Sequence, residues 1–106
     1  MILITGLGPA GLDRLPAETH RRLLDPAATV VLRTLAHPAA AELAAQRPVE
    51  SCDDLYEAAA DFDEVYRGIT ARVLQRAEAG PVAYAVPGSA LVGERAVALI
   101  REAARA

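Results

Sequence analysis

The chain has 106 residues, of which 53% are hydrophobic and 24% charged, and its formal net charge is −3 with no lysine. This size and balance predict one folded domain and exclude a disordered chain or a membrane-spanning protein. No basic cluster is present, so we expect no nucleic-acid partner. The single cysteine, Cys52, excludes an internal disulfide and a multi-cysteine zinc site. Without a secretory leader at Met1, a cytoplasmic protein is expected.

Strand and helix patterns alternate along the first half of the chain. The apolar run Met1–Thr5 predicts a buried strand, and Ala17–Leu24 predicts a helix with Pro16 in its first turn. The β-branched segment Thr29–Arg33 predicts a second strand. An alanine-rich helix is then expected over His37–Gln46, opened by a histidine-proline pair.

The middle of the chain is less regular at first and then strongly helical. Val49–Cys52 predicts a weak third strand, and Leu55–Ala60 predicts one short helical turn. Asp61 and Glu64 form a reciprocal capping pattern, so a long helix is expected from there to Gly80. The apolar face of that helix consists of Phe62, Val65, Tyr66, Ile69, Val73 and Ala77.

A fourth strand, Val82–Val86, and a final helix complete the pattern. We expect the inner face of the final helix to hold Val92, Ala96, Leu99, Ile100 and Ala103. Four apolar strands, each followed by a helix, predict a single three-layer α/β domain with a mainly parallel sheet of four to five strands. Ligands of such sheets bind beyond the carboxyl ends of the strands, here at Gly6–Leu15 and Pro87–Gly93.

The loop after the first strand, GLGPAG at residues 6–11, satisfies the dinucleotide pattern G-x-G-x-x-G. Its context disfavours that interpretation, because the next helix begins only at Pro16 and Pro9 removes an amide donor. Arg33 lies where a ribose-binding carboxylate is expected, although an arginine suits a 2′-phosphate. NADP binding therefore stays a minor alternative, and a plain strand-to-helix turn is another.

Four segments, taken in chain order, are more specific indicators of function than the glycine pattern alone. They are ITGLGPAG at residues 4–11, VLRTLAHP at 31–38, SCDDLYE with FDEVY between 51 and 66, and YAVPGSALVGER at 84–95. Together they resemble the N-terminal domain of the tetrapyrrole (corrin/porphyrin) methylase family, in the branch fused to MazG-type nucleotide pyrophosphohydrolases. The resemblance covers nearly the whole chain.

The resemblance implies a protein of two α/β domains with S-adenosylmethionine bound between them. Residues 1–106 correspond to the first domain only, so the second methylase domain is absent and this domain is expected to be inactive alone. The complete protein would methylate an unidentified small-molecule acceptor, and a homodimer is expected. No catalytic residue and no metal are implied.

The matching motifs also imply a set of binding residues. The donor wall consists of Pro9, Pro87, Ser89 and Val92. The expected substrate contacts are Gly8, Arg33 and His37. Porphyrin methylases carry an aspartate where Ser89 stands. That difference favours an alternative, a non-catalytic ligand-sensing or dimerisation module that regulates a fused pyrophosphohydrolase.

Ordinary structural roles compete with these interpretations. His37 is expected as a helix cap or turn residue, and His20 on a solvated helix face. Arg33 is expected to pair with Asp53 or Asp54 if it does not bind a ligand. The two aspartates predict a loop and helix cap rather than a metal site. The tyrosines expected in the core or at an interface are Tyr56, Tyr66 and Tyr84.

Overall fold

The computed structural model describes residues 2–8, 11–87 and 95–105. Its four strands form one parallel sheet in the order β1-β4-β2-β3. The strands are β1 (Ile2–Gly6), β2 (Thr29–Leu32), β3 (Glu50–Ser51) and β4 (Val82–Val86). The helices are the 3-10 turn η1 (Leu12–Arg14), α1 (Ala17–Leu23), α2 (Pro38–Gln46), α3 (Asp53–Ala58), α4 (Phe62–Ala79) and α5 (Arg95–Arg105).

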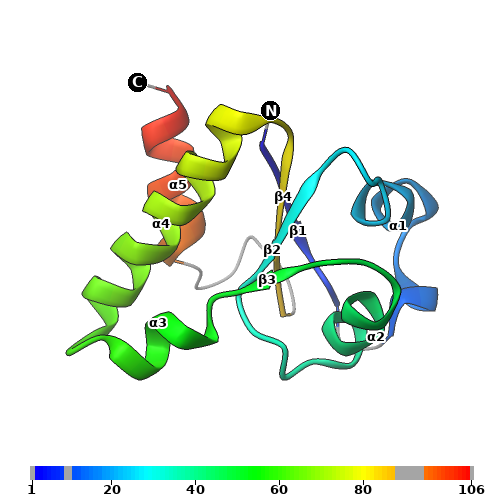
Figure 1. Cartoon of the computed structure of the whole chain (residues 1–106), viewed down its shortest axis with the longest axis horizontal. Coiled ribbons are helices and arrows are strands. Elements are labelled where there is room, and N and C mark those ends of the chain that lie inside the picture. Colours follow the sequence, from blue (N-terminus) through cyan, green and yellow to red (C-terminus); the bar gives the residue numbers. More distant parts are fainter. Residues whose placement is uncertain (1, 9–10, 88–94, 106) are drawn as a thin grey trace.

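The sheet lies between two layers of helices. Helices α1 and α2 cover one face, and α3, α4 and α5 lie on the other (Figure 1). The predicted three-layer α/β fold is therefore confirmed, with a sheet of four described strands that are all parallel.

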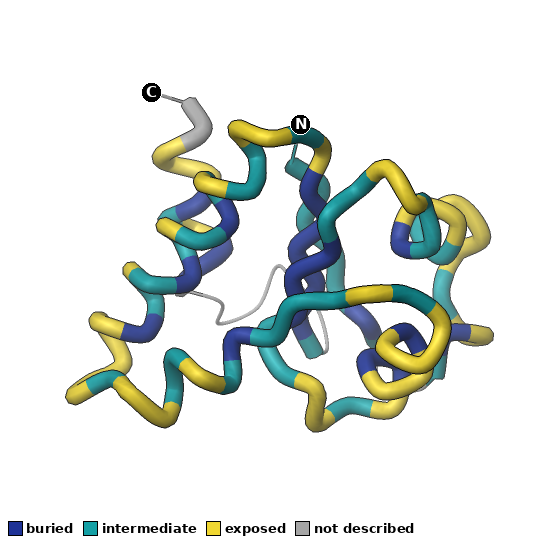
Figure 2. The backbone as a smooth tube through the Cα atoms, viewed as in Figure 1, coloured by how far each residue is buried: buried dark blue, intermediate teal, exposed yellow. Residues whose placement is uncertain are grey.

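Strand β4 lies in the interior of the sheet and separates two cores. Its five residues are all buried (Figure 2). Val82, Tyr84 and Val86 point into the cluster formed with α4 and α5. Ala83 and Ala85 point into the leucine-rich cluster formed with α1 and α2. Because side chains alternate along a strand, a single segment supplies large residues to one layer and small residues to the other.

Two helix starts show how side chains set the boundaries. Helix α3 begins at Asp53, earlier than predicted, because the Ser51 hydroxyl accepts the Asp53 N–H at 3.0 Å. The predicted cap of α4 is confirmed, since the Asp61 carboxylate accepts the Glu64 N–H at 2.8 Å. In return, the Glu64 carboxylate accepts a hydrogen bond from the Ala60 N–H at 2.9 Å.

The predicted helix faces are correct in their centres and wrong at their ends. Val65, Ile69 and Val73 of α4 are buried as expected. Phe62 was predicted in the core but is 68% exposed and stacks on Tyr66, with ring centroids 6.2 Å apart. The reason is that α4 begins at Phe62, at the end of the helix that lies far from the sheet (Figure 1).

The final helix shows the same pattern. Ala96 and Ile100 are buried as predicted, and Val97 is buried as well. Ala103 is exposed and Leu99 is only half-buried, because both line an open groove between α4 and α5 and not the core against the sheet. Val92 lies outside the described residues. In α1, His20 is half-buried rather than fully solvated.

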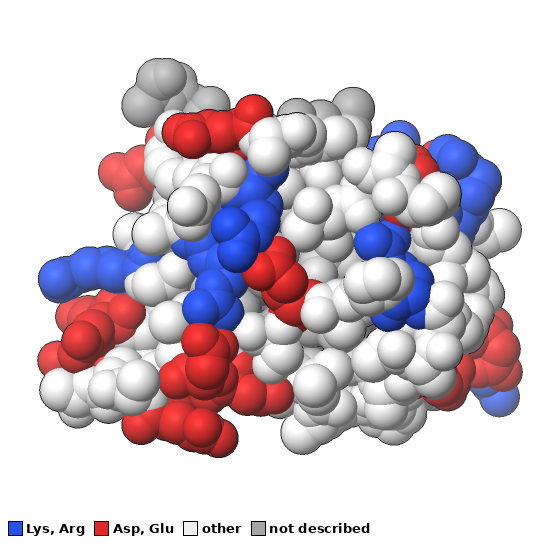
Figure 3. Space-filling model, in the orientation of Figure 1, with Lys and Arg blue, Asp and Glu red and all other residues white. Residues whose placement is uncertain are grey.

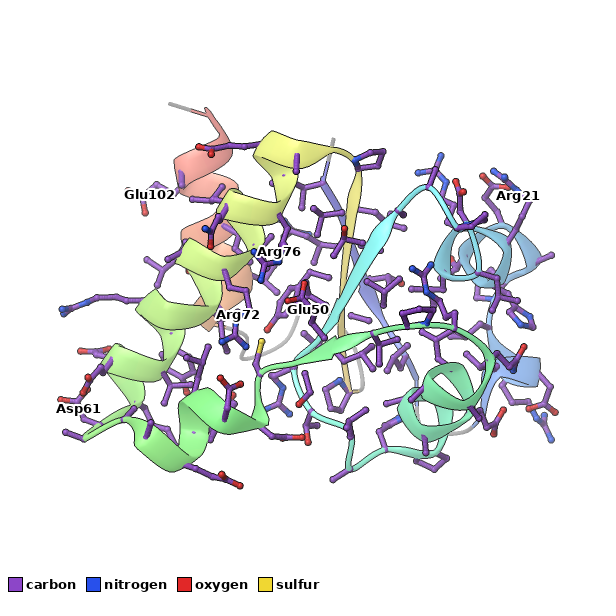
Figure 4. All side chains as sticks on the ribbon, in the orientation of Figure 1. Arg21, Glu50, Asp61, Arg72, Arg76 and Glu102 are labelled. Atoms are coloured by element: carbon purple, nitrogen blue, oxygen red, sulfur yellow. The ribbon has the colours of Figure 1, made fainter. Side chains whose placement is uncertain are left out.

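Strand β3 has only two residues and is held in place by arginines of α4. The Arg76 guanidinium binds both carboxylate oxygens of Glu50 at 2.7 and 2.8 Å. Arg72 binds both oxygens of Asp54 at 2.9 and 2.8 Å and also the Ser51 carbonyl at 2.9 Å. Figure 3 shows the basic side chains over α4 lying against this acidic segment, and in Figure 4 Arg76 points toward Glu50.

Candidate functional site

The carboxyl ends of all four strands meet at one edge of the sheet, here called the carboxyl edge. Gly6 is paired with Val86, and Leu32 is paired with both Ala85 and Ser51. The ladder continues one step beyond β1, because the Leu7 N–H donates to the Val86 carbonyl at 2.8 Å. The last residues of β1, β4, β2 and β3 therefore lie side by side in that order.

The glycine loop, Gly6–Gly11, leaves the sheet at this edge. Gly8 has φ +67, in the left-handed region where an L side chain is strained. Apart from its two neighbours in the chain, no described residue has an atom within 4 Å of the position that a Gly8 Cβ would take. Glycine is therefore required here by backbone conformation, and the space beside it is open to a ligand.

Two side chains of the α2 segment hold the glycine loop. The His37 ring contacts the Gly8 carbonyl through Nε2 at 2.7 Å. The Glu42 carboxylate accepts the Leu12 N–H at 3.2 Å, and a Cβ on Gly11 would collide with that carboxylate. The loop is thus anchored on both sides of residues 9–10, by bonds that span about thirty residues of sequence.

The two nitrogens of His37 have different roles. Its Nδ1 accepts the Ala39 N–H at 3.0 Å, which caps the start of α2. A nitrogen that accepts carries no proton, so the neutral ring holds its proton on Nε2 and donates it to Gly8. The predicted cap role of His37 is confirmed. Both nitrogens are used within the protein, which makes this residue an anchor of the loop.

Arg33 follows β2 and lies against Tyr56 of α3. Its Nη1 donates to the Tyr56 hydroxyl at 3.1 Å, and the guanidinium carbon is 6.0 Å from the ring centroid. A cation over an aromatic ring at this distance is a stabilising arrangement. The pair places positive charge at the carboxyl edge beside the ends of β2 and β3.

The two neighbouring aspartates have structural partners. Asp53 accepts the Leu35 N–H at 3.1 Å and the Ser51 hydroxyl at 2.8 Å, and these bonds hold the pKa of Asp53 below its usual value. The pKa of Asp54 is lowered by its bonds to Arg72. Both lie in the first turn of α3, but the predicted helix-cap role is wrong, because Cys52 is the N-cap residue and no side chain caps the helix there. Within the described ranges, no group of three histidine, cysteine, aspartate or glutamate side chains could hold a metal ion.

Cys52 is fully buried at the end of β3. Burial raises the pKa of its thiol to about 11. A protonated, inaccessible thiol is a poor nucleophile. Cys52 therefore acts as a core residue.

The predicted binding residues fall into two groups. Gly8, Arg33, His37 and Pro87 all lie at the carboxyl edge. Pro9, Ser89 and Val92 lie outside the described residues. Glu42 is a further anchor of the loop that no sequence motif marks, because nothing in the local pattern distinguishes a helical glutamate that reaches a loop thirty residues earlier.

A cavity of about 610 Å³ lies at the opposite end of β2, lined mainly by apolar side chains and Arg47. The Arg47 guanidinium donates to the carbonyls of Leu23, Asp25 and Ala28 at 3.2, 2.7 and 2.7 Å. Its charge thus ties the end of α1 to the turn before β2 and is not directed at a ligand.

The comparisons with known proteins give one relative and no family. No family model matches the chain, and no solved structure matches it. The chain is 36% identical over 102 residues to the uncharacterized protein YabN of Bacillus subtilis (strain 168). That match covers 95% of this chain and 21% of YabN, so the chain spans about a fifth of the length of the curated relative it matches. Among the helices that the structure describes, none has the length and apolarity needed to cross a bilayer.

Proposed function

We propose that this chain is the first domain of an S-adenosylmethionine-dependent methyltransferase of the tetrapyrrole methylase type. One observation carries the proposal: the glycine loop at the carboxyl edge, with a left-handed Gly8, open space beside it and two anchors from the α2 segment. A loop held this firmly next to open space is suited to bring its backbone against a ligand. The four motifs of the sequence resemblance supply the family.

The proposed donor pocket uses the loops after β1 and β4. Gly8 and Pro87 follow neighbouring strands, and the motif places Pro9, Ser89 and Val92 in the same two loops. The donor supplies a methyl group that its sulfonium already activates, so the protein has mainly to position donor and acceptor. Open space at Gly8 is compatible with this, because a flat adenosine or an extended chain can approach bare backbone.

The acceptor is proposed to lie further along the same edge. Gly8, Arg33 and His37 were the expected contacts, and of these Arg33 contributes a positive charge held by Tyr56. His37 is assigned a positioning role through Gly8, since its two nitrogens are engaged. No catalytic base is assigned in this domain.

A second domain is part of the proposal. The chain covers 21% of YabN, which is compatible with further domains in proteins of this type. With one wall of the cleft, the 106-residue chain is expected to bind the donor weakly and to transfer no methyl group.

The test is isothermal titration of S-adenosylhomocysteine into the chain and into a form that includes any following domain, with NADP as the control ligand. We expect binding in the longer form that Ser89→Ala and Pro87→Ala weaken, while His20→Ala, on a helix away from the edge, leaves it unchanged. Absence of binding in the longer form would overturn the proposal. NADP binding alone would identify a dinucleotide loop.

A second candidate is a ligand-sensing or dimerisation module that regulates a fused nucleotide pyrophosphohydrolase. It is favoured by the length of YabN and by Ser89 in place of an acidic residue. It predicts that S-adenosylhomocysteine changes the nucleotide hydrolysis rate of the longer protein without any methyl transfer. The homodimer belongs to both candidates, and light scattering over a range of concentrations tests it.

A further inference from the structure

We propose that the groove between α4 and α5 is the surface on which a second copy of this chain docks, in a two-fold symmetric dimer. The inference names the interface of the homodimer that belongs to both candidate functions, so it rests on that homodimer and not on methyl transfer. Three observations carry it: an open apolar groove, two charged side chains in the groove that the described residues leave unpaired, and the diagonal placement of these charges.

The groove has a volume of about 490 Å³ and is open to solvent. It is lined mainly by apolar surface, and its two leucines, Leu74 of α4 and Leu99 of α5, are half-buried. The Thr70 hydroxyl in the groove donates to the Tyr66 carbonyl at 2.8 Å, so this polar group already has a partner. An open apolar groove with charged side chains at its rim is typical of a surface that binds another protein.

Each helix contributes one charged side chain to the groove, Arg67 from α4 and Glu102 from α5. Among the residues that the structure describes, neither side chain has a partner in a hydrogen bond or an ion pair. The arginines Arg72 and Arg76 of α4 differ, because both bind carboxylates beside β3. Figure 4 shows Glu102 on the side of this layer that faces away from the sheet. A partner that covers the groove therefore has to supply one acidic and one basic group.

The two charges lie at opposite corners of the groove. Helices α4 and α5 run in the same direction, and both end toward the amino ends of the strands (Figure 1). Arg67 precedes Leu74 on α4, and Leu99 precedes Glu102 on α5. Arg67 and Leu99 therefore lie toward one end of the groove, and Leu74 and Glu102 lie toward the other. One diagonal of the groove joins the opposite charges, and the other diagonal joins the two leucines.

This arrangement is self-complementary, which selects a second copy as the occupant. A two-fold axis in the interface, perpendicular to the line between the two charges, exchanges the ends of that line. It places Arg67 of each copy beside Glu102 of the other, so that two symmetric ion pairs form. The leucine diagonal lies near this axis, so each leucine packs against its own symmetry copy. Burial of the leucines supplies the binding free energy, and the ion pairs fix the orientation.

The experiment measures the dimer Kd by analytical ultracentrifugation of the 106-residue chain over a range of concentrations. We expect the wild type to dimerise. Arg67→Glu sets two glutamates against each other twice in each dimer, so the Kd is expected to rise roughly tenfold, and Glu102→Arg has the same effect with two arginines. The double variant, Arg67→Glu with Glu102→Arg, exchanges the charges and is expected to restore a Kd close to that of the wild type.

A matched control separates pairing from net charge. Arg101→Glu makes the same change of charge as Arg67→Glu, at an exposed position of α5 outside the groove, and should leave the Kd unchanged. Circular dichroism of each variant checks that the fold is retained.

Three results would overturn the proposal. A chain that stays monomeric into the millimolar range would refute the homodimer as well, and would leave the groove to a different protein. A dimer whose Kd responds to neither single charge reversal would refute this interface alone, because the copies would then meet through another surface. A double variant as weak as the single variants would show that the two charges do not pair with each other.

Discussion

At the scale of single residues, His37 connects two parts of the protein that are far apart in sequence. Its Nδ1 caps α2 through the Ala39 N–H, and its Nε2 binds the Gly8 carbonyl. An uncharged ring with a defined tautomer is needed for both bonds. The stability of the helix start and the position of the glycine loop therefore depend on one side chain.

The two bonds of His37 can be separated by substitution. We expect His37→Ala to lower the free energy of unfolding by about 1–2 kcal/mol, since it removes the cap and the loop anchor. His37→Asn keeps an acceptor for Ala39 but is too short to reach Gly8, so about half of that loss is expected. Urea denaturation measures both. An asparagine variant as unstable as the alanine variant would show that the cap contributes nothing.

Gly8 is the described residue whose backbone conformation most requires glycine. We expect Gly8→Ala to destabilise the fold by about 1–2 kcal/mol through strain alone, because among the described residues that are not its chain neighbours none would meet the new Cβ. Gly80→Ala is the matched control, since its Cβ would also meet nothing and its φ of 160 is close to extended. Thermal unfolding compares the two, and an equal effect would contradict the role of the left-handed conformation.

At the scale of elements, the short strand β3 depends on α4. Two residues form too few ladder bonds to hold an edge strand, and the bidentate pairs from Arg72 and Arg76 add fixed contacts. These pairs lie partly in solvent, with the Arg76 and Glu50 side chains 37% and 35% exposed. Each pair is therefore expected to contribute less than about 1 kcal/mol.

The pairing of Glu50 makes stability depend on pH. Bonds from Arg76 lower the pKa of Glu50 below its ordinary value of 4.5, so the folded state holds the charged form more strongly than the unfolded state. Its stabilising effect is present above that value and is lost as the pH falls through the lower, folded value. We expect Glu50→Gln to show a shallower loss of stability below about pH 5 than the wild type.

Thermal unfolding between neutral pH and about pH 3 measures this difference. Glu78→Gln removes an exposed carboxylate near the end of α4, the helix that carries Arg76; it serves as the control and should keep the wild-type slope. A Glu50→Gln profile parallel to the wild type would show that the ion pair does not couple to folding.

At the scale of the whole molecule, the two helical layers pack against side chains of different size on the two faces of the sheet. The α1–α2 layer packs leucines against the small Ala83 and Ala85 of β4, while the α4–α5 layer meets Val82, Tyr84 and Val86. Small residues on one face allow bulky ones from the helices to fill the same space.

We expect Ala85→Leu to destabilise the protein by about 1–3 kcal/mol, because Ala85 is fully buried and the added volume has no room. Ala71→Leu makes the same change on the exposed face of α4 and should alter stability by less than about 0.5 kcal/mol. Calorimetric melting compares the two. If Ala85→Leu melts like the wild type, the α1–α2 layer is not closely packed.

Features with a local cause were predictable from the sequence. The valines of 29–33 identify a strand, and Asp61 with Glu64 identifies a helix start, because β-branched packing and capping act within a few residues. The placement of Gly8, Arg33, His37 and Pro87 at one edge also followed, since parallel strands bring their carboxyl ends together.

Features that depend on neighbours distant in sequence were not predictable. The helical period placed Phe62 in the core, but whether a layer covers that position depends on where α4 crosses the sheet. Arg33 donates to Tyr56 and the Leu12 amide donates to Glu42, through bonds between segments that only the fold brings together.

The sequence alone thus determined the α/β class, the order of strands and helices, and the edge of the sheet where a site can form, because periodicity, caps and breakers are local. Only the tertiary structure decided the strand order β1-β4-β2-β3 and the anchoring of the glycine loop by the α2 segment. These are contacts between surfaces, and they exist only once the layers have packed together.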